Sequence, residues 1–460
     1  VVSHKDLYES DHIFTIVDFI NQIIKGCHEN NKNAPRRFVI DSVRNSLEIM
    51  YLRERYNAFY MVAVHNDGNE NKLITEKVFK AVYKEDINKK SQDELQRLAP
   101  MLQRIERLNK IESSIEDFEK GLFYGADISR CVAESEIHII NNCISELADK
   151  GRVNTFFTAA EQWMKFYALI VRPGLITPSR DERCMAVANV AKLNSGCISR
   201  KVGCTIVDSS YAVQSVGWND PPSSQLPCQL RYVDEFLGTG NIGEDPNYQL
   251  KNHIYSNYEL AGMPTIKGNT FKQCLNEEIP DNGINEELAK YGLRYSYCFR
   301  SRYNKYKGQK DQVNTRSLHA EENTMLRLSK VGGKGLDGGI MYVTASPCVL
   351  CSKKAYQIGI KEIVYLDPYT DIAPDLIIHC GWNPPKLRPF MGAIGTTFDK
   401  LYRPFMPFKD ELAIWEKNFS PKKSIKGRIE ELRRMQISYK EAAEKLQFEI
   451  DNLEKEGDNQ

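Results

Sequence analysis

The chain is organised around Arg316-Ser317-Leu318-His319-Ala320-Glu321-Glu322-Asn323 and, after a spacer, Thr344-Ala345-Ser346-Pro347-Cys348-Val349-Leu350-Cys351. Together these stretches contain H-x-E followed by P-C-x-x-C. His319, Cys348 and Cys351 supply three metal ligands, and no fourth ligand is visible between residues 317 and 353. Three protein ligands with an open fourth position are typical of a catalytic zinc site, whereas structural zinc sites are closed. The pattern therefore disfavours a zinc knuckle or a pair of buried thiols.

The residue types in this pattern match one chemistry. Thiolates and an imidazole suit Zn²⁺, which lowers the pKa of a bound water to about 7. Glu321 lies two residues from His319, so it can reach the same water without binding the metal. This combination resembles the signature of zinc nucleobase deaminases, in which hydroxide attacks C4 of cytosine and ammonia leaves. The resemblance implies that Glu321 carries a proton from the water to the ring N3.

The motifs fall on predictable local structure. Residues 321–328 read as a helix, 339–344 as a buried strand and 348–358 as a second helix. Both ligand groups are therefore expected at helix N-termini, where the positive end of the helix dipole favours thiolate.

The composition excludes several classes of protein. Among 460 residues, 42% are hydrophobic and 27% are charged, as in an ordinary globular protein. The 62 Lys and Arg residues balance 61 Asp and Glu residues, which argues against a dedicated nucleic-acid binder. Twelve scattered cysteines that include a metal pattern fit a reducing compartment. No signal peptide and no apolar run near about 18 residues is visible. We therefore expect a cytoplasmic protein without a membrane partner.

The first 171 residues read as a separate α/β domain. Helical apolar spacing covers residues 13–24, and residues 48–55 continue as a second helix. Apolar runs at 37–41 and 59–64 read as strands. Strand, helix and strand in this order predict a parallel sheet.

One segment of this first domain resembles P-loop nucleotide kinases. Asp41-Ser42-Val43-Arg44-Asn45 follows an apolar run, and 135–142 resembles a late strand of that fold. The resemblance implies a Mg²⁺ contact for Asp41 and a phosphate contact for Arg44. However, G-x-x-x-x-G-K-[ST] is absent from the sequence, so the phosphate cradle is missing. The alternative is that Asp41 caps the next helix and Arg44 forms an ion pair.

A second domain is predicted over residues 172–420. The breaker cluster 172–178 serves as linker, and Ser179 can cap a helix at 180–193. Segments 202–208 and 212–219 read as a β-hairpin, and 363–366 as a further strand. With the two motif helices, this order predicts a three-layer α/β/α domain of the cytidine deaminase type.

Longer pieces carry a closer resemblance. They are Asn194-Ser195-Gly196-Cys197-Ile198-Ser199-Arg200, Thr315 to Asn323, and Phe390-Met391-Gly392-Ala393-Ile394-Gly395. They resemble bacterial anti-phage dCTP/dCMP deaminases, which join an N-terminal P-loop kinase-like domain to a C-terminal deaminase. The resemblance implies Zn²⁺ as cofactor, conversion of dCTP or dCMP to dUTP or dUMP, and depletion of the nucleotide pool during infection. It also implies a homo-oligomer.

The resemblance also implies a set of substrate contacts. Asn219 would contact the sugar, Ala320 and Ser346 would offer backbone groups to the base, and Tyr365 would line the pocket. Candidates for the phosphate, by position only, are Arg200, Lys201 and Arg316. Asn219 could equally be a turn residue before two prolines. Tyr365 could equally be core, and the three cations surface charges.

Residues 220–315 form an insertion rich in Asn, Gly and Tyr. It contains Cys228, His253, Cys274 and Cys298, so a second, structural zinc is one interpretation. The wide spacing favours free buried thiols instead. We expect the insertion to form a lid or a subunit contact over the pocket.

The segment 421–460 reads as one long charged helix. Its apolar residues follow heptad spacing over about three repeats, which is typical of a coiled coil. We expect it to face a partner chain, with packing on its own domain as the alternative.

Two other functions fit the zinc motif. A deaminase that acts on single-stranded DNA or RNA would need cationic tracks and stacking aromatic residues, which the balanced charge disfavours. A non-catalytic nucleotide sensor would have no need of Glu321. Because uncontrolled loss of dCTP would harm the cell, we also expect an inhibitor, such as an RNA or a protein.

Overall fold

The structure is a computed structural model of the whole chain. It describes residues 13–30, 37–65, 79–80, 91, 96–104, 123, 125–141, 155–238, 255–260, 268–279, 284–308, 314–332, 335–368, 373–417, 444 and 447–448. Within this part of the chain, no helix is both long and apolar enough to cross a bilayer. The predicted heptad helix of the tail lies almost wholly outside the described residues.

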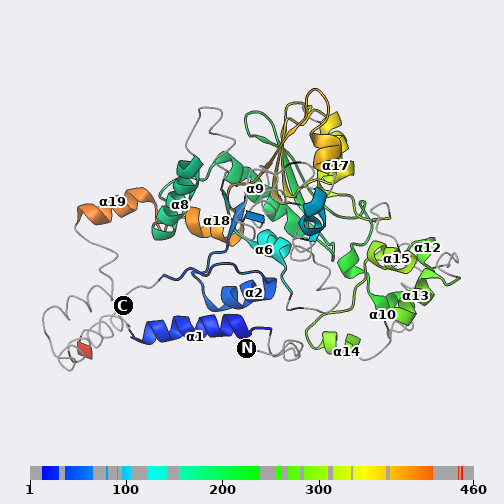
Figure 1. Cartoon of the computed structure of the whole chain (residues 1–460), viewed down its shortest axis with the longest axis horizontal. Helices are drawn as coiled ribbons and strands as arrows, with labels where there is room; N and C mark the ends of the chain where they lie inside the picture. The colour runs from blue at the N-terminus through cyan, green and yellow to red at the C-terminus, as the bar shows by residue number, and fades with distance from the viewer. Residues whose placement is uncertain are drawn as a thin grey trace, which may run out of the picture. The chain divides into compact units, whose positions relative to one another are not determined.

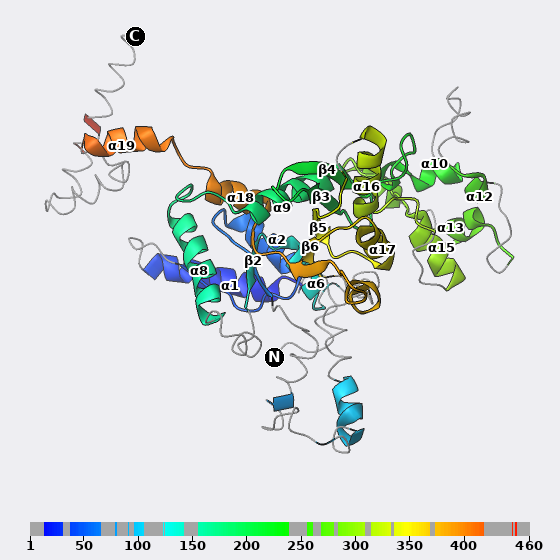
Figure 2. The same cartoon turned by 90° about the horizontal axis from the view of Figure 1, so that it is seen from above.

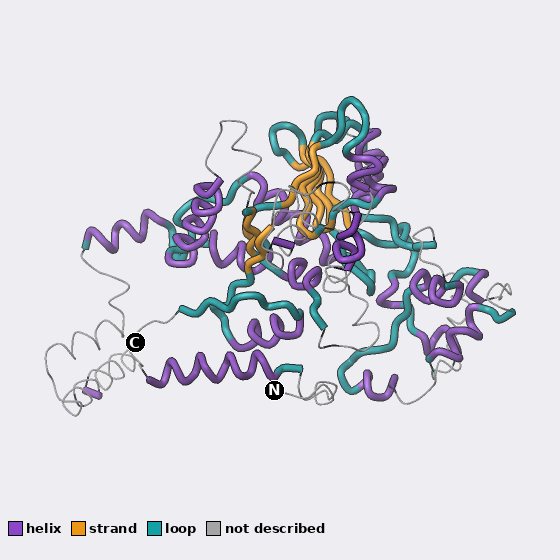
Figure 3. The backbone as a smooth tube through the Cα atoms, in the orientation of Figure 1, coloured by secondary structure: helices purple, strands orange, loops and turns teal. Residues whose placement is uncertain are grey.

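A five-stranded sheet forms the centre of the second half of the chain (Figure 3). Its strands lie in the order β4-β3-β5-β6-β7, with β4 at Val213–Trp218, β3 at Gly203–Val207, β5 at Ile340–Ala345, β6 at Glu362–Asp367 and β7 at Lys386–Pro389. β3 pairs antiparallel with β4 and β5, whereas β5, β6 and β7 are parallel. The predicted hairpin of residues 202–208 and 212–219 and the predicted strands at 339–344 and 363–366 are confirmed.

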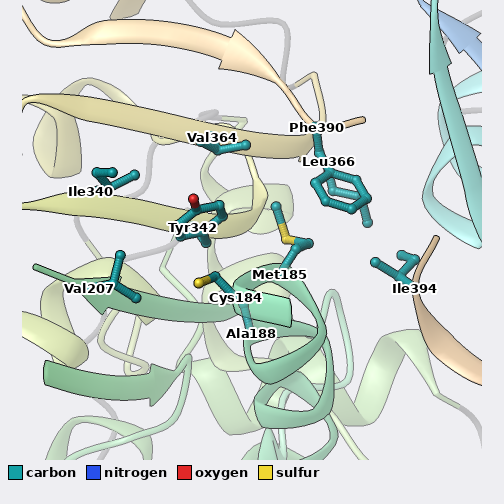
Figure 4. Close-up of a cluster of buried hydrophobic side chains, with 10 residues drawn as sticks. All are labelled: Cys184, Met185, Ala188, Val207, Ile340, Tyr342, Val364, Leu366, Phe390 and Ile394. Atoms are coloured by element: carbon teal, nitrogen blue, oxygen red, sulfur yellow. The ribbon is translucent and has the colours of Figure 1, made fainter. Parts of the chain in front are cut away.

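Helices cover both faces of this sheet. α9 (Arg180–Ala191) lies on one face and shares a buried core with alternate residues of β3, β5 and β6, including Val207, Tyr342 and Val364 (Figure 4). α16 (Ala320–Val331) and α17 (Val349–Gln357) lie on the other face, over Cys204, Met341 and Ile363. The predicted α/β class and the layering around this sheet are confirmed.

Local sequence explains how closely these helices approach the sheet. Ser179 caps α9 through a capping box, because its side chain accepts from Glu182 N while the Glu182 carboxylate accepts from Ser179 N. A Cβ at Gly203 would lie 2.0 Å from Ala188 O of α9, and one at Gly217 would lie 2.4 Å from Thr324 Oγ1 of α16. Only glycine lets both helices pack at this distance.

The N-terminal region forms a smaller sheet of three strands. β1 (Val62–His65) pairs parallel with β2 (Ile137–Ile140), whereas the predicted partner of the 59–64 strand was the segment 37–41. The third strand, β8 (Gly392–Ala393), pairs antiparallel with β2 and comes from the far end of the sequence. Helices α1 (Thr15–Asn30), α2 (Ser46–Arg55) and α6 (Ile128–Glu134) accompany this sheet.

The prediction of a strand at residues 37–41 is wrong. Residues 37–45 form no strand, and Val39 is 95% exposed although its neighbours are apolar. Ser42 has φ +63°, a left-handed conformation that a continuing strand cannot contain. Apolar character alone therefore did not bring this segment into the sheet.

The structure divides into two compact units. One contains residues 1–167 and 177–400, and the other contains residues 168–176 and 401–460. The N-terminal elements and the five-stranded sheet thus belong to the same unit. Glu136, which precedes β2, accepts hydrogen bonds from Thr396 N and Thr397 Oγ1 at the start of α18 (Gly395–Tyr402). α8 (Thr155–Val171) crosses the boundary, and α19 (Phe408–Glu416) lies in the second unit. The predicted domain boundaries at 171 and 420 stay predictions.

The insertion folds around an aromatic core. Its short elements are η5 (Cys228–Leu230), α10 (Val233–Leu237), α12 (Asn257–Leu260), α13 (Phe271–Glu278), α14 (Ile284–Ala289) and α15 (Phe299–Lys307). Of these, α10, α12, α13 and α15 are labelled on the right of Figures 1 and 2. Phe236, Phe271 and Tyr297 pack together, with ring centroids 5.4 to 6.1 Å apart. Shorter segments elsewhere are the 3-10 turn η4 (Lys192–Asn194) and the π-helical turn η7 (Pro374–Ile378).

Candidate metal centre

The three predicted ligands converge at one point. Cys348 Sγ and Cys351 Sγ each lie 3.4 Å from His319 Nδ1, and all three ligand atoms lie within 4.8 Å of one another. His319 is the N-cap of α16 and Cys348 is the N-cap of α17. The two helices therefore present their ligands from the positive ends of their dipoles, as the sequence predicted.

The donor set fits zinc. Zn–N and Zn–S bonds of about 2.0 and 2.3 Å at tetrahedral angles require N···S separations of about 3.5 Å. The observed 3.4 Å separations match this value for both sulfur atoms. Two thiolates and one imidazole would thus hold a zinc ion through three bonds and leave it free to take a further ligand.

Glu321 lies beside these ligands in a buried position. Its side chain is 4% exposed, and it is hydrogen-bonded to the Cys351 thiol. Burial raises the pKa of Glu321 to about 7. The hydrogen bond from Cys351, with help from His319, lowers the pKa of Cys348 to about 4. A buried carboxyl group next to a thiolate is arranged to hold or release a proton.

The two ligand helices are fixed to the sheet and to each other. Asn323 Nδ2 donates to Trp218 O at 2.8 Å, which ties α16 to the end of β4. Lys354 of α17 forms an ion pair with Glu322 of α16. These contacts fix the positions of the two ligand helices, and none of them involves a ligand side chain.

Asn219 joins the loop that precedes β3 to the end of β4. Its Nδ2 donates to Arg200 O at 2.8 Å, and its Oδ1 accepts from Val202 N at 2.7 Å. Ser195 Oγ also donates to Asn219 O at 2.7 Å. Both side-chain groups of Asn219 thus have backbone partners, and its predicted contact with a sugar stays a prediction.

Arg200 lies at the same edge of the sheet as the metal centre. It pairs with Asp367 at the end of β6, and Asp367 O accepts a hydrogen bond from Ser346 N at 2.9 Å. Burial raises the pKa of Asp367 to about 6, although the charge of Arg200 opposes this rise. Sequence reasoning missed Asp367. An acid directly after the apolar strand residues 363–366 was the signal that could have found it.

The other predicted substrate contacts are spread around this edge. Ala320 is fully buried and packs with Met325 in the core under α16. Tyr365 packs partly buried against the same core, on the sheet face that α16 and α17 cover. Lys201 is exposed next to Arg200. Ser346 directly precedes the Pro347-Cys348 turn.

Arg316 is held by the insertion rather than exposed at the surface. Its Nη1 lies 3.1 Å from Glu259 Oε2, and Glu259 also pairs with the fully buried Arg231. The Tyr297 hydroxyl donates to Glu259 Oε1 at 3.0 Å. Burial opposes ionisation of Glu259, but Arg231 and the Ser256 donors outweigh it and hold its pKa below the usual value. Because the sequence separates Arg231, Glu259 and Arg316 widely, no local pattern predicted this clamp.

The structure does not bring Asp41 and Arg44 into this centre. Both lie in the extended segment before α2, where Asp41 accepts a hydrogen bond from Ser42 and Arg44 O accepts one from Asp127 N. Asn45, not Asp41, caps α2. Their kinase-like contacts stay predictions.

The insertion cysteines form a pair. Cys228 and Cys298 are hydrogen-bonded, and this contact lowers the pKa of Cys298 to about 6. Cys274 is half-buried, and His253 lies outside the described residues. Within the described part of the chain, His319, Cys348 and Cys351 make up the one cluster of three such side chains close enough to share a metal ion.

Comparison with known proteins agrees with this geometry. Residues 178–367 match the family model of the cytidine and deoxycytidylate deaminase zinc-binding region. The chain contains a deoxycytidylate deaminase-like domain. The matched region is a zinc-binding region, and it contains His319, Cys348 and Cys351, the candidate ligand set.

Individual relatives are similar to parts of this chain. The deoxycytidylate deaminase of Enterobacteria phage T2 is 26% identical over 210 residues, which is 44% of this chain and 92% of that protein. ComE operon protein 2 of Bacillus subtilis is 44% identical over 54 residues, which is 12% of this chain and 28% of that protein. The dCMP deaminase of cyanophage S-TIM5, solved with dCMP and dUMP, is 18% identical, with coverage of 47% and 99% and a TM-score of 0.26.

Proposed function

We propose that this chain removes the exocyclic amine of deoxycytidine nucleotides by hydrolysis of the C4–N bond. The reaction converts dCTP or dCMP to dUTP or dUMP and releases ammonia. The observation that carries the proposal is the open three-ligand cluster with the buried Glu321 beside it. Similarity to deoxycytidylate deaminases over residues 178–367 supports the cytosine base as the target.

Each residue has a distinct task in this reaction. Bound by His319, Cys348 and Cys351, zinc would supply Lewis acidity that makes water a nucleophile at neutral pH. Glu321 accepts a proton from that water and delivers it to the ring N3 while the oxygen adds to C4. Glu321 then transfers the remaining hydroxyl proton to the amine, the C4–N bond breaks and ammonia leaves. One water is consumed and one carbonyl is formed, so the atoms balance.

The sheet edge next to the metal centre suits a nucleotide. Arg200, anchored by Asp367, and the neighbouring Lys201 offer positive charge there for the phosphate. Asn219 fixes the backbone on both sides of Lys201, so we assign it a role in shaping this edge in addition to the predicted sugar contact. Ala320, Ser346 and Tyr365 flank the base. Arg316, held by Glu259, is the third candidate for the phosphate.

We propose that the biological role is depletion of the deoxycytidine nucleotide pool as an anti-phage defence in the cytoplasm. This role follows from the sequence resemblance, as do a homo-oligomeric assembly and control by an RNA or a protein. Over-expression during phage infection should lower cellular dCTP, and nucleotide pools measured by mass spectrometry test this directly.

The test of the reaction is a substrate panel. Ammonia release is measured with dCTP, dCMP, CTP and a single-stranded oligonucleotide that contains one cytosine. We expect turnover of a deoxynucleotide, and the ratio of dCTP to dCMP turnover ranks the substrates. Turnover of the oligonucleotide alone would contradict the proposal and indicate a nucleic-acid deaminase. Zinc-loaded protein that turns over none of the four compounds would favour the nucleotide-sensor alternative.

A further inference from the structure

A hollow with a volume of 380 Å³ lies between α1 and the end of α2, on the two blue helices in Figure 1. Its lining residues are Asn21, Ile24, Lys25, His28, Arg55 and Tyr56. None of these residues belongs to the elements that carry the zinc ligands, and none was among the predicted site residues.

The floor of the hollow is neutral and ordered by hydrogen bonds. Asn21 and Ile24 are 5% and 7% exposed, and the Tyr56 hydroxyl donates to Asn21 Oδ1 at 2.7 Å. Val17 and Leu52 are buried in the core that joins the two helices. The floor thus offers an aliphatic side chain, an amide and an aromatic ring at fixed positions.

The rim is basic. Lys25, His28 and Arg55 are exposed at the surface, and they come from two different helices. The Arg55 guanidinium lies 3.4 Å from the centroid of the Tyr51 ring, which limits its freedom. Among the described residues, no carboxylate lines the hollow. The nearby Asp18 carboxylate accepts hydrogen bonds from Tyr51 and Gln22.

Basic residues in the last turn of a helix also stabilise the negative end of its dipole. That effect accounts for cations on each helix separately. It does not account for cations of α1 and α2 surrounding one hollow with a neutral, hydrogen-bonded floor. Basic side chains from two helices that line one hollow are suited to binding phosphate groups.

We propose that this hollow binds a phosphate-bearing small molecule, with the phosphates at Lys25, His28 and Arg55 and the remainder of the ligand against Tyr56 and Ile24. The volume lies in the range of small-molecule sites, which suits a nucleotide. This site is independent of the zinc centre, so it stands whether or not the proposed deamination is correct. It differs also from the kinase-like contacts predicted for Asp41 and Arg44.

The test is isothermal titration calorimetry of the full-length chain with ATP, inorganic pyrophosphate and adenosine. These probes avoid the cytosine pocket because none carries a cytosine. We expect ATP to bind at least tenfold more tightly than adenosine. Pyrophosphate binding as tight as that of ATP would mean that the hollow recognises phosphate alone. Weaker pyrophosphate binding would mean that the ring contributes, and both results support a phosphate site.

Variants then locate the binding. Lys25→Glu, and Lys25→Glu combined with Arg55→Glu, should weaken ATP binding at least tenfold, whereas Lys330→Glu, an exposed cation on α16, should leave it unchanged. Circular dichroism checks that each variant is folded. If the double variant is misfolded, the single variant Lys25→Glu, at an exposed position, decides the result. Absence of ATP and pyrophosphate binding at millimolar concentrations would overturn the proposal. Binding that Lys25→Glu leaves unchanged would overturn it as well.

Discussion

The two sheets of the first unit differ in how far a local sequence pattern predicts them. In the five-stranded sheet, each motif lies at the end of its own strand or helix, so the spacing H-x-E and P-C-x-x-C fixes the metal centre locally. In the three-stranded sheet, β2 pairs with β1 and with β8, which is separated from it by about 250 residues. Chemistry coded by local spacing is therefore predictable from sequence, whereas a sheet completed by a distant segment is not.

The two regions also differ in the kind of titratable groups that they bury. The metal centre groups two thiols, an imidazole and a carboxyl group that a zinc ion can satisfy together. The N-terminal sheet instead buries His65 and His138, whose Nε2 and Nδ1 atoms are 2.9 Å apart. His138 Nε2 donates to Ser135 O, so its Nδ1 accepts from His65 Nε2 when both rings are neutral. One region is built to hold a charged ion, and the other is built to exclude charge.

The largest effect should come from removing a zinc ligand. Cys351→Ala should abolish zinc binding and deamination together, because two remaining ligands cannot hold the ion. Zinc content by inductively coupled plasma mass spectrometry and ammonia release measure the two effects. The exposed Cys380 provides the control, since Cys380→Ala should retain both. Full zinc occupancy in Cys351→Ala would show that the metal is held elsewhere.

A smaller effect is expected from breaking the ion pairs of Glu259 with Arg231 and Arg316, which join the insertion to the segment before His319. Glu259→Gln leaves the guanidinium groups of Arg231 and Arg316 buried without their carboxylate. Breaking a buried ion pair costs about 3 to 5 kcal/mol in the free energy of unfolding. Urea denaturation followed by circular dichroism measures this loss.

A matched control for the clamp is Glu287→Gln. Glu287 pairs with Lys290 in the same insertion, but both side chains are more than half exposed. Exposed pairs of this kind contribute about 1 kcal/mol or less. Equal losses in the two variants would contradict the view that the clamp, rather than surface charge, holds the insertion.

The smallest effect concerns the histidine pair. Burial lowers the pKa of His65 to about 4 and, together with the charge of His65, that of His138 to about 3. Since the unfolded rings titrate near 6.5, the unfolded state binds more protons below this pH. The free energy of unfolding should therefore fall as the pH drops below about 6.5, by roughly 1.4 kcal/mol per pH unit for each ring.

Denaturation curves at several pH values between 7.5 and 5 measure this slope for the wild type and for His138→Gln. The zinc centre is identical in both proteins, so its own acid sensitivity cancels in the difference. The variant should show the shallower slope. Parallel slopes would mean that the pair does not control acid stability in this region.

The fold could be predicted from sequence where residues close together in the chain determine the local structure. Ser179 predicted the start of α9, and the segments 202–208 and 212–219 predicted the hairpin, because capping and strand pairing here involve near neighbours. The segment 37–41 looked like a strand because it is apolar, but strand formation needs a partner, and the structure provides none there. Arg316 was a phosphate candidate by position alone, and its pairing with Glu259, 57 residues away, is invisible to any local pattern.

The most direct test of the account is Glu321→Gln. This substitution keeps the shape of the side chain and removes its ability to carry a proton, so zinc should stay bound while ammonia release from dCTP or dCMP falls about 10³-fold. Glu322→Gln, which removes the ion pair with Lys354 but leaves Glu321 in place, should remain active. Zinc-loaded Glu321→Gln with wild-type turnover would contradict the central claim that this buried carboxyl group transfers the proton.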